Sequence, residues 1–223
     1  MNQEQALSLL KETKLVAILR GIPVKQATDI ATALYDGGVR VLEFTFDHDD
    51  PDCVAHNCQR IRAVKKIFGD EMVVGCGTAL TVQEVEASVE AGGQIVISPN
   101  VDVNVIAKTK ALGAISMPGA LTPTEIVMAY NAGADIVKLF PAGTLGVPYI
   151  KAVRGPLGYI PMSAVGGVRP ETIADFLNVG VCGFGVGGEL VKKEFVRSGD
   201  MNALTSRARK FVHAIEQWEA NRS

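Results

Sequence analysis

Lys138 is a candidate nucleophile because it stands inside an apolar segment. It occupies the middle of the run from 134 to 142, which is Ala-Asp-Ile-Val-Lys-Leu-Phe-Pro-Ala. This pattern predicts a parallel strand buried on both faces. Burying an ammonium group is costly, so we expect a pKa below the usual value of about 10.4. A neutral lysine can attack a carbonyl to form a Schiff base, whereas the alternative is a side chain that reaches from the strand end to a carboxylate.

Glu43 lies in a second apolar strand, predicted over residues 39–45. Side chains alternate between the two faces of a strand, so Glu43 shares a face with Val41 and Thr45. The apolar residues between them suit contact with helices, and Glu43 is therefore expected to point into the interior. There it would serve as a general acid and base beside the amine of Lys138. A structural ion pair between Glu43 and Lys138 is the alternative.

Arg20 and two glycine pairs are candidate groups for binding anions. Arg20 ends the apolar strand 15–19, where its guanidinium would hold a carboxylate; the alternative is a surface arginine. The glycine pairs follow the last two predicted strands. Such turns let backbone N–H groups approach a phosphate, and their place after the last two strands favours this role; tight packing between strand and helix is the alternative. The four residues are Gly166, Gly167, Gly187 and Gly188.

The acidic run Asp47-His48-Asp49-Asp50 contains residue types that bind metals. We expect no metal there, because no further histidine or cysteine converges on the run in the sequence. Asp50 is expected to cap a helix that begins at Pro51. The four cysteines form no CxxC pair, so neither a zinc site nor a disulfide framework is predicted.

A repeated unit of strand, turn, helix and glycine would position these residues. Further helices are predicted over residues 3–13 and 202–220, and capping boxes begin at Thr81 and Thr122. The repeat predicts an α/β protein with a single domain, residues 1–223, folded as a (β/α)8 TIM barrel with an extra N-terminal helix. An open doubly wound sheet is the alternative, disfavoured because the first turn lacks a G-x-G-x-x-G fingerprint. The predicted strands cover residues 15–19, 39–45, 72–76, 94–98, 114–117, 135–139, 160–165 and 182–186.

The composition limits the classes of partner. The chain has 223 residues, a formal net charge of -2 and no basic stripe, so nucleic acid is not an expected partner. No apolar run approaches about 18 residues, and the first residues lack a basic segment. We therefore expect no membrane association and a cytoplasmic location.

Seven segments together resemble the class I, pyruvate-dependent aldolases that cleave 2-keto-3-deoxy-6-phosphogluconate (KDPG) and 4-hydroxy-2-oxoglutarate (KHG). Each segment is weak evidence alone, but their order along most of the chain is highly specific. The segments are Leu-Val-Ala-Ile-Leu-Arg-Gly at 15–21, Val-Leu-Glu at 41–43, Gly-Cys-Gly-Thr at 75–78, Ile-Ser-Pro-Asn at 97–100, Met-Pro-Gly at 117–119, Val-Lys-Leu-Phe-Pro at 137–141 and Val-Gly-Gly at 165–167.

The resemblance implies roles for individual residues. Lys138 would form the Schiff base, Glu43 would shuttle protons, and Thr78 would help to hold the carboxylate of the pyruvyl group. The distal phosphate would lie against the four glycines named above. The family also implies a homotrimer that needs no metal and no cofactor beyond the covalent imine. The pocket would be shaped by Pro99, Pro118 and Phe140.

Two positions depart from the family pattern. Phosphogluconate-type members commonly carry an arginine where this chain has Asp47, and Arg20 is expected to substitute for it. Relatives often have a phosphate-binding serine where this chain has Gly188. The pattern around Arg20 and the segment 140–152 are similar to those of the phosphogalactonate branch.

We predict a lyase of carbohydrate metabolism of the Entner-Doudoroff type. It would cleave a 2-keto-3-deoxy sugar acid to pyruvate and an aldehyde such as glyceraldehyde 3-phosphate. The expected substrate is the 6-phosphorylated gluconate or galactonate form, and 4-hydroxy-2-oxoglutarate is a further candidate. One alternative is a phosphosugar isomerase or epimerase that uses Glu43 as its base. Another is a sugar-acid-binding protein without catalysis. Release of pyruvate separates the aldolase from both.

Overall fold

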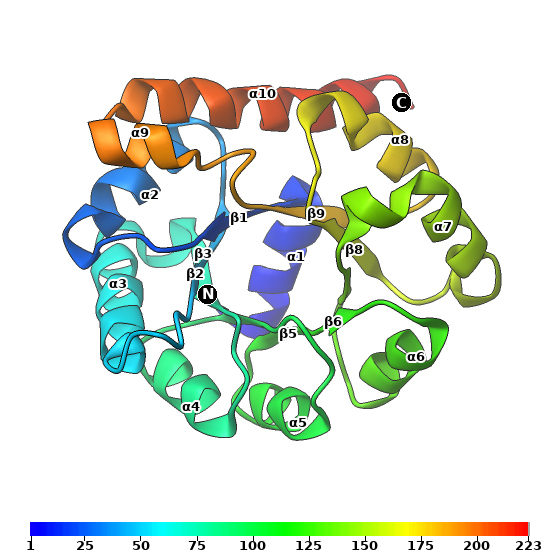
Figure 1. The fold of residues 1–223 in the computed structure, drawn as a ribbon, viewed down its shortest axis with the longest axis horizontal. Coiled ribbons are helices and arrows are strands. Elements are labelled where there is room, and N and C mark those ends of the chain that lie inside the picture. The colour runs from blue at the N-terminus through cyan, green and yellow to red at the C-terminus, as the bar shows by residue number, and fades with distance from the viewer. Residues whose placement is uncertain (223) are drawn as a thin grey trace.

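The strands form a closed parallel barrel in the computed structural model, which describes residues 1–222. The sheet order is β5-β4-β3-β2-β1-β9-β8-β7-β6. Pro118 alone separates β5 from β6, so β5 pairs with β4 while β6 pairs with β7, and together they close the ring (Figure 1). The strands are β1 (Leu15–Leu19), β2 (Val41–Thr45), β3 (Val73–Gly77), β4 (Ile95–Ile97), β5 (Ile115–Met117), β6 (Gly119–Ala120), β7 (Val137–Leu139), β8 (Met162–Val165) and β9 (Gly183–Val186).

Helices surround this barrel and one helix closes its end. The predicted (β/α)8 barrel with an extra N-terminal helix is confirmed. Three short 3-10 helices are η1 (Val24–Gln26), η2 (Gly69–Glu71) and η3 (Pro170–Thr172) within residues 1–222. The α-helices are α1 (Gln3–Thr13), α2 (Ala27–Asp36), α3 (Cys53–Phe68), α4 (Val82–Glu90), α5 (Val103–Ala111), α6 (Pro123–Asn131), α7 (Ala142–Leu157), α8 (Ile173–Asn178), α9 (Lys193–Ser198) and α10 (Met201–Ala220).

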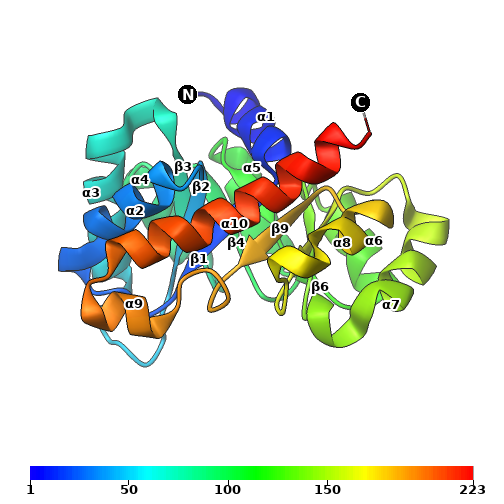
Figure 2. The same ribbon diagram turned by 90° about the horizontal axis from the view of Figure 1, so that it is seen from above.

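The apolar side chains divide into two cores because alternate strand residues face opposite sides. Leu42 and Phe44 point outward and pack among the helices. Val41 points inward with residues of the other strands, and this inner core also contains Ala6 and Leu10 of α1. Figure 2 shows α1 at one end of the barrel. The opposite, carboxyl ends of the strands are therefore the open end.

Two of the predicted helix starts are confirmed and a third is wrong. Thr81 and Thr122 form the predicted capping boxes, with Glu84 and Glu125 as their partners. The predicted start of a helix at Pro51 is wrong, because α3 begins at Cys53. Asp50 instead accepts hydrogen bonds from the backbone N–H of Asp52 at 3.0 Å and pairs with Nδ1 of His56 at 2.7 Å. A local turn thus uses the carboxylate that the sequence suggested as a cap.

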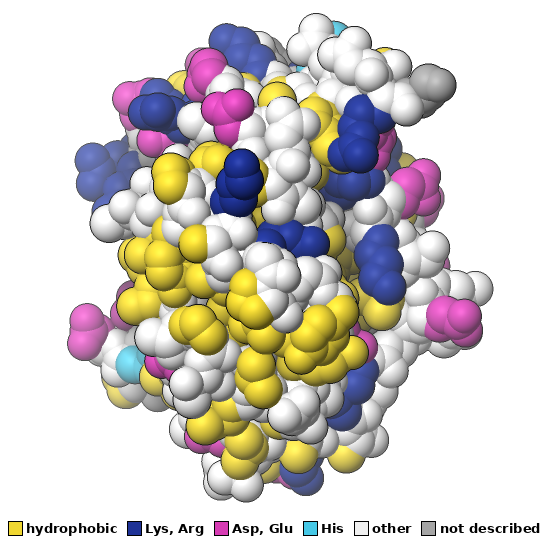
Figure 3. Space-filling model, turned by 90° about the vertical axis from the view of Figure 1, so that its right-hand side faces the viewer, with side chains coloured by type: hydrophobic (Ala, Val, Ile, Leu, Met, Phe, Trp, Pro, Cys, Tyr) yellow, Lys and Arg dark blue, Asp and Glu magenta, His cyan; other side chains and the backbone are white. Residues whose placement is uncertain are grey.

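Large hydrophobic side chains gather on the side of the barrel formed by α6 and α7 (Figure 3). We define the α6–α7 face by Leu121, Met128, Tyr130 and Tyr159, all of which are exposed. The rings of Tyr130 and Tyr159 make an edge-to-face contact with centroids 5.7 Å apart. Exposed apolar clusters of this kind are typical of protein–protein contact surfaces. No helix within residues 1–222 is long and apolar enough to cross a membrane.

Candidate functional site

A cavity of about 430 Å³ opens at the carboxyl ends of the strands. This is the end at which barrels of this architecture carry their active sites. Pro118, the eleventh predicted site residue, is buried between β5 and β6, where its carbonyl accepts the backbone N–H of Lys138 at 2.9 Å. The ten predicted residues that line the cavity are Arg20, Glu43, Thr78, Pro99, Lys138, Phe140, Gly166, Gly167, Gly187 and Gly188.

Lys138 is buried in β7 and opens only towards the cavity. Its residue surface is 7% exposed, and Nζ lies 5.0 Å from the centroid of the Phe140 ring. Burial lowers the pKa of Lys138 below its usual 10.5, while the charge of Glu43 opposes this shift and that of Arg20 adds to it. The pKa shift increases the fraction of neutral, nucleophilic amine at neutral pH.

Glu43 is buried in β2 and keeps one oxygen without a partner. Its surface is 1% exposed, and Oε2 accepts no hydrogen bond within residues 1–222. Burial raises the pKa of Glu43 from 4.5 to about 7, although Lys138 and Arg20 partly oppose the shift. A carboxyl group that titrates near neutral pH can both accept and return a proton during a reaction.

Glu43 and Lys138 face each other across the barrel. In the sheet order, β1, β9 and β8 separate β2 from β7, so the two strands form opposite walls. No ion pair within 4.0 Å joins the two side chains, although each affects the pKa of the other. The alternative of a structural ion pair is therefore wrong for this structure. Both side chains line the same cavity.

Gly77 provides the room that the carboxyl group of Glu43 occupies. Glu43 lies in β2 and Gly77 lies in the neighbouring strand β3, where Gly77 is in register with Thr45 of β2. A Cβ atom added at Gly77 would lie 1.8 Å from Oε2 of Glu43 and 2.4 Å from its Cδ. Any side chain at position 77 would therefore collide with Glu43. The sequence contained Gly77 in the segment at 75–78, but no pattern along one strand indicated this contact.

Thr78 follows directly and has a strained backbone. Its φ is 58°, in the left-handed region that β-branched residues rarely adopt. Such a conformation costs on the order of 1–3 kcal/mol and is typical of residues held for a functional purpose. Arg20 lies at the end of β1 on the cavity wall and is exposed. Thr78 and Arg20 thus offer a hydroxyl and a guanidinium to the same cavity.

The glycine turns after β8 and β9 present free backbone donors. Gly166 and Gly167 have φ values of 90° and 73°, and a Cβ atom at Gly167 would lie 3.1 Å from Cα of Gly143. The tight packing suggested as an alternative is therefore present as well. Within residues 1–222, no hydrogen bond uses the N–H groups of these glycines or of Gly187 and Gly188. These N–H groups can bind an anion.

Residues without an assigned role complete the cavity wall. Ile18 and Val165 point inward from β1 and β8, and Glu189 follows the second glycine pair. Side chains alternate along a strand, so Ile18 lies on the same face as Arg20. This alternation was the signal that could have identified Ile18 as a residue of the cavity. For Val165 and Glu189 the signal was their adjacency to the glycine pairs.

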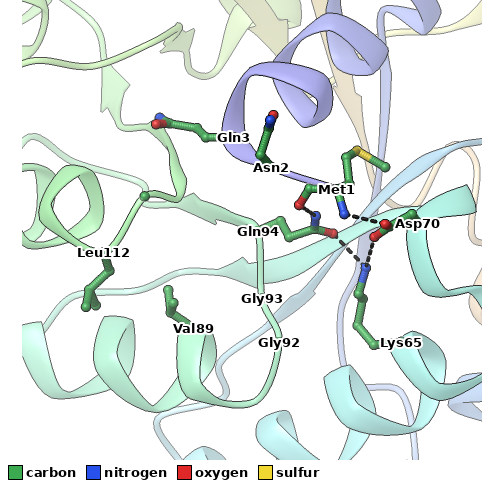
Figure 4. A pocket seen from close by; sticks show the side chains of 11 residues that line it. Met1, Asn2, Gln3, Lys65, Asp70, Val89, Gly92, Gly93, Gln94 and Leu112 are labelled. Carbon is green, nitrogen blue, oxygen red and sulfur yellow. Dashed lines mark hydrogen bonds and ion pairs between the residues drawn. The ribbon is translucent and has the colours of Figure 1, made fainter.

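A pocket at the other end of the barrel has its polar groups paired with each other (Figure 4). The amino group of Met1 pairs with Asp70, and Nζ of Lys65 donates to Oε1 of Gln94 at 2.8 Å. The side-chain amide of Gln94 donates to the carbonyl of Met1 at 3.2 Å. These contacts hold α1 against the barrel. Because these polar groups bind one another, we interpret the pocket as part of the contact between the N-terminal segment and the barrel.

Two side chains of the acidic run after β2, His48 and Asp50, pair with neighbouring side chains. No group of three or more histidine, cysteine or acidic side chains that could hold a metal occurs in residues 1–222. His48 instead pairs with Glu84, with 2.7 Å between Nε2 and Oε1. Asp47 is exposed and lies outside the cavity at the carboxyl ends of the strands.

Known proteins resemble the chain throughout the barrel. Residues 7–207 match the family described as "KDPG and KHG aldolase". A 2-dehydro-3-deoxy-6-phosphogalactonate aldolase of Escherichia coli (strain K12) is 35% identical over 80% of this chain and 84% of its own length. A KHG/KDPG aldolase of the same strain is 32% identical over 95% of this chain and 96% of its own. A structure titled "Native KDPGal structure" has a TM-score of 0.83 at 32% identity, covering 92% of this chain and 96% of that one.

Proposed function

Because the chain belongs to the KDPG and KHG aldolase family, we propose that it is a class I aldolase in which Lys138 forms an imine with a 2-keto acid. The observation that carries this proposal is the pairing of two buried groups across one cavity. Lys138 has a lowered pKa, and Glu43 has a pKa near 7. A nucleophilic amine opposite a titratable carboxyl group is the arrangement that imine-based cleavage requires.

The reaction begins when neutral Lys138 attacks the C2 ketone of the substrate. Loss of water gives an iminium, which attracts electrons from the adjacent carbon–carbon bonds. Glu43, directly or through a water, removes the proton of the C4 hydroxyl. The C3–C4 bond then breaks, its electron pair moves into the iminium to form an enamine, and an aldehyde leaves. Protonation of the enamine at C3 and hydrolysis of the imine release pyruvate and restore the amine.

Two polar groups would orient the keto acid. The guanidinium of Arg20 can pair with the carboxylate, and Thr78 can donate its hydroxyl to the same group. Their positions on the cavity wall would keep the C2 ketone near Nζ of Lys138. Holding the reactants in this geometry supplies a large part of the rate enhancement. Pro99 and the ring of Phe140 bound the same space.

The distal end of the cavity suits a phosphate. The free N–H groups of the two glycine pairs provide the donors, in turns that follow the last two strands. Gly188 lacks a hydroxyl, and a Cβ atom there would meet open space. Backbone donors alone would therefore hold the phosphate. We propose a 6-phosphorylated 2-keto-3-deoxy sugar acid as the substrate, with the galactonate form favoured by the similarity to the phosphogalactonate aldolase.

A panel of substrates tests this function. We expect pyruvate release from 2-dehydro-3-deoxy-6-phosphogalactonate or the corresponding phosphogluconate, measured with a lactate dehydrogenase coupled assay after dialysis against EDTA. The unphosphorylated sugar acids should show a higher KM, because they lose contacts to the glycine turns. 4-Hydroxy-2-oxoglutarate serves as the short comparison substrate. Interconversion of phosphosugars without pyruvate would contradict the proposal and support an isomerase.

We propose that the protein assembles as a homotrimer through its α6–α7 face. The exposed apolar residues of this face would be buried by a second copy. Light scattering coupled to gel filtration should give three times the chain mass of 23.7 kDa. Tyr159→Glu, which places a charge at a side chain that is 64% exposed, should shift the protein to smaller species. Lys151→Glu on the neighbouring part of α7 is the matched charge control, and a monomeric wild-type protein would refute the assembly.

A further inference from the structure

A second cavity lies beside the catalytic one and shares Arg20 with it. Its volume is about 610 Å³, within the range of small-molecule sites. We call it the lateral groove. It runs between the segment after β1, residues 20–26, and helix α9. The side chain of Gln26 donates to the carbonyl of Val196 at 3.3 Å and ties these two walls together.

Four cations line the lateral groove without neutralising partners. Arg20, Lys25, Lys193 and Arg197 form no ion pair within 4.0 Å and no side-chain hydrogen bond in the described chain. Asp47 is the one acidic residue of the lining. This local excess of positive charge contrasts with the net charge of -2 of the whole chain. Unpaired cations around a cavity raise the local concentration of anions.

Cations next to the groove are paired, which makes the groove distinct from the surrounding surface. Lys192 lies 3.8 Å from Glu194, and Arg207 lies 3.5 Å from Glu189. Lys193 follows Lys192 directly in the sequence, yet only Lys193 faces the groove. These neighbouring carboxylates are therefore paired with Lys192 and Arg207, and within residues 1–222 neither is paired with a cation of the groove lining.

The floor of the groove is apolar. Ile22 and Val191 are buried beneath it, and Val196 is half-buried on the wall of α9. A bare inorganic ion would meet the charged rim but would make no contact with the half-buried Val196 or the apolar floor. A molecule with a carbon body and a negatively charged group complements both the floor and the rim. Asp47 provides an acceptor for hydroxyl groups on such a molecule.

We propose that the lateral groove binds a phosphate monoester of a small polyhydroxylated molecule and thereby draws Arg20 away from the catalytic cavity. The Lys193 and Arg197 side chains hold the phosphate, and the carbon body covers Ile22 and Val191. Because Arg20 belongs to both cavities, an occupied groove weakens carboxylate binding at the catalytic site. Binding stands independently of the proposed aldolase activity, while the effect on Arg20 rests on it. The segment after β1 and helix α9, which form the groove, lie on the side of the barrel opposite α6 and α7 (Figure 1).

Isothermal titration of the intact protein with glucose 6-phosphate, which is not a keto acid, tests the binding. We expect saturable binding that weakens with added KCl, and at least a 10-fold higher Kd for the double variant Lys193→Ala/Arg197→Ala. Lys192→Ala, which removes the paired neighbour, should bind as the wild type does. Inorganic phosphate should bind more weakly, because it leaves the apolar floor uncovered. Equal Kd values for glucose 6-phosphate in the wild type and the double variant would overturn the proposal.

A kinetic measurement tests the effect on Arg20. Glucose 6-phosphate should raise the KM for the keto-acid substrate without lowering kcat in the wild type, and should leave the KM of the double variant unchanged. The Kd of glyceraldehyde 3-phosphate, the expected product, is measured in the same way. A lower Kd than that of glucose 6-phosphate would indicate feedback by the product, and a higher one would indicate control by another phosphate ester. Because such coupling is reciprocal, pyruvate should weaken the binding of glucose 6-phosphate by the same factor. A KM raised equally in the wild type and the double variant would place glucose 6-phosphate in the catalytic cavity and overturn the proposal. Groove binding without any pyruvate release would refute the aldolase alone.

Discussion

Lys138→Ala is expected to lower kcat/KM for pyruvate release by roughly 10⁴-fold or more, because no other amine occupies the cavity in residues 1–222 to form the imine. The substitution removes a buried cation and should preserve the fold, so the thermal unfolding midpoint is not expected to fall sharply. Pyruvate release and circular dichroism of the same preparation measure the two effects. Near-normal cleavage by Lys138→Ala would refute the mechanism.

Borohydride trapping gives this prediction a chemical readout. Reduction in the presence of pyruvate should attach the pyruvyl group to the peptide that contains Lys138, as identified by mass spectrometry. Lys151→Ala is a matched control, because Lys151 is an exposed lysine of the nearby helix α7 and lies outside the cavity. Trapping should persist in this control and disappear in Lys138→Ala. A label found on another lysine would move the nucleophile to that residue.

Gly77→Ala is expected to lower kcat about 10²-fold or more, although Gly77 itself donates no chemical group. The added methyl would lie 1.8 Å from Oε2 of Glu43, so the carboxyl group must move away from the reacting hydroxyl. The loss should approach that of removing a general acid and base, which contributes about 10²–10⁴-fold. Steady-state kinetics with the phosphorylated substrate measure it. Normal kcat in Gly77→Ala would contradict the proposed role of Glu43.

The pH profile separates a displaced catalytic group from a general loss of structure. Glu43 must be deprotonated to accept the C4 hydroxyl proton, and its pKa is about 7, so kcat/KM for cleavage should rise as the pH increases through about 7. The neutral fraction of Lys138 also increases with pH, which supports the same direction. Gly77→Ala should shift the part of this rise that Glu43 contributes near pH 7, because the carboxyl group leaves its buried position. Glu43→Gln should remove that part and leave only the rise that comes from Lys138.

Two further variants control for steric damage. In the Glu43→Ala background the space beside Gly77 is vacant, so adding Gly77→Ala should cost little further activity or stability. Such non-additivity is expected only for residues in direct contact. Gly155→Ala in α7 has no atom within 4 Å of the added Cβ and should leave activity unchanged. Additive losses from Glu43→Ala and Gly77→Ala would instead indicate an independent effect of position 77.

The local sequence was sufficient to propose the catalytic pair. Lys138 is conspicuous because a charged residue interrupts an apolar strand, and Glu43 is directed inward by strand alternation. The capping boxes at Thr81 and Thr122 are equally local, since their partners lie three residues away. The eight predicted strands all occur, and the structure adds a ninth, β6, after Pro118. Each of these features depends on residues within one turn or one strand.

Contacts between distant segments could be decided only by the tertiary structure. The clearance between Gly77 and Glu43 depends on the register of two neighbouring strands, and the insertion of Leu10 into the inner core depends on how α1 crosses the barrel end. Asp50 was misassigned because His56, rather than a helix N-terminus, supplied its partner. The lateral groove unites Lys25 with Arg197, which no periodicity connects. Periodicity reports the direction of a side chain from its own strand or helix, whereas distances across a closed barrel follow from the stagger and packing of all its strands together.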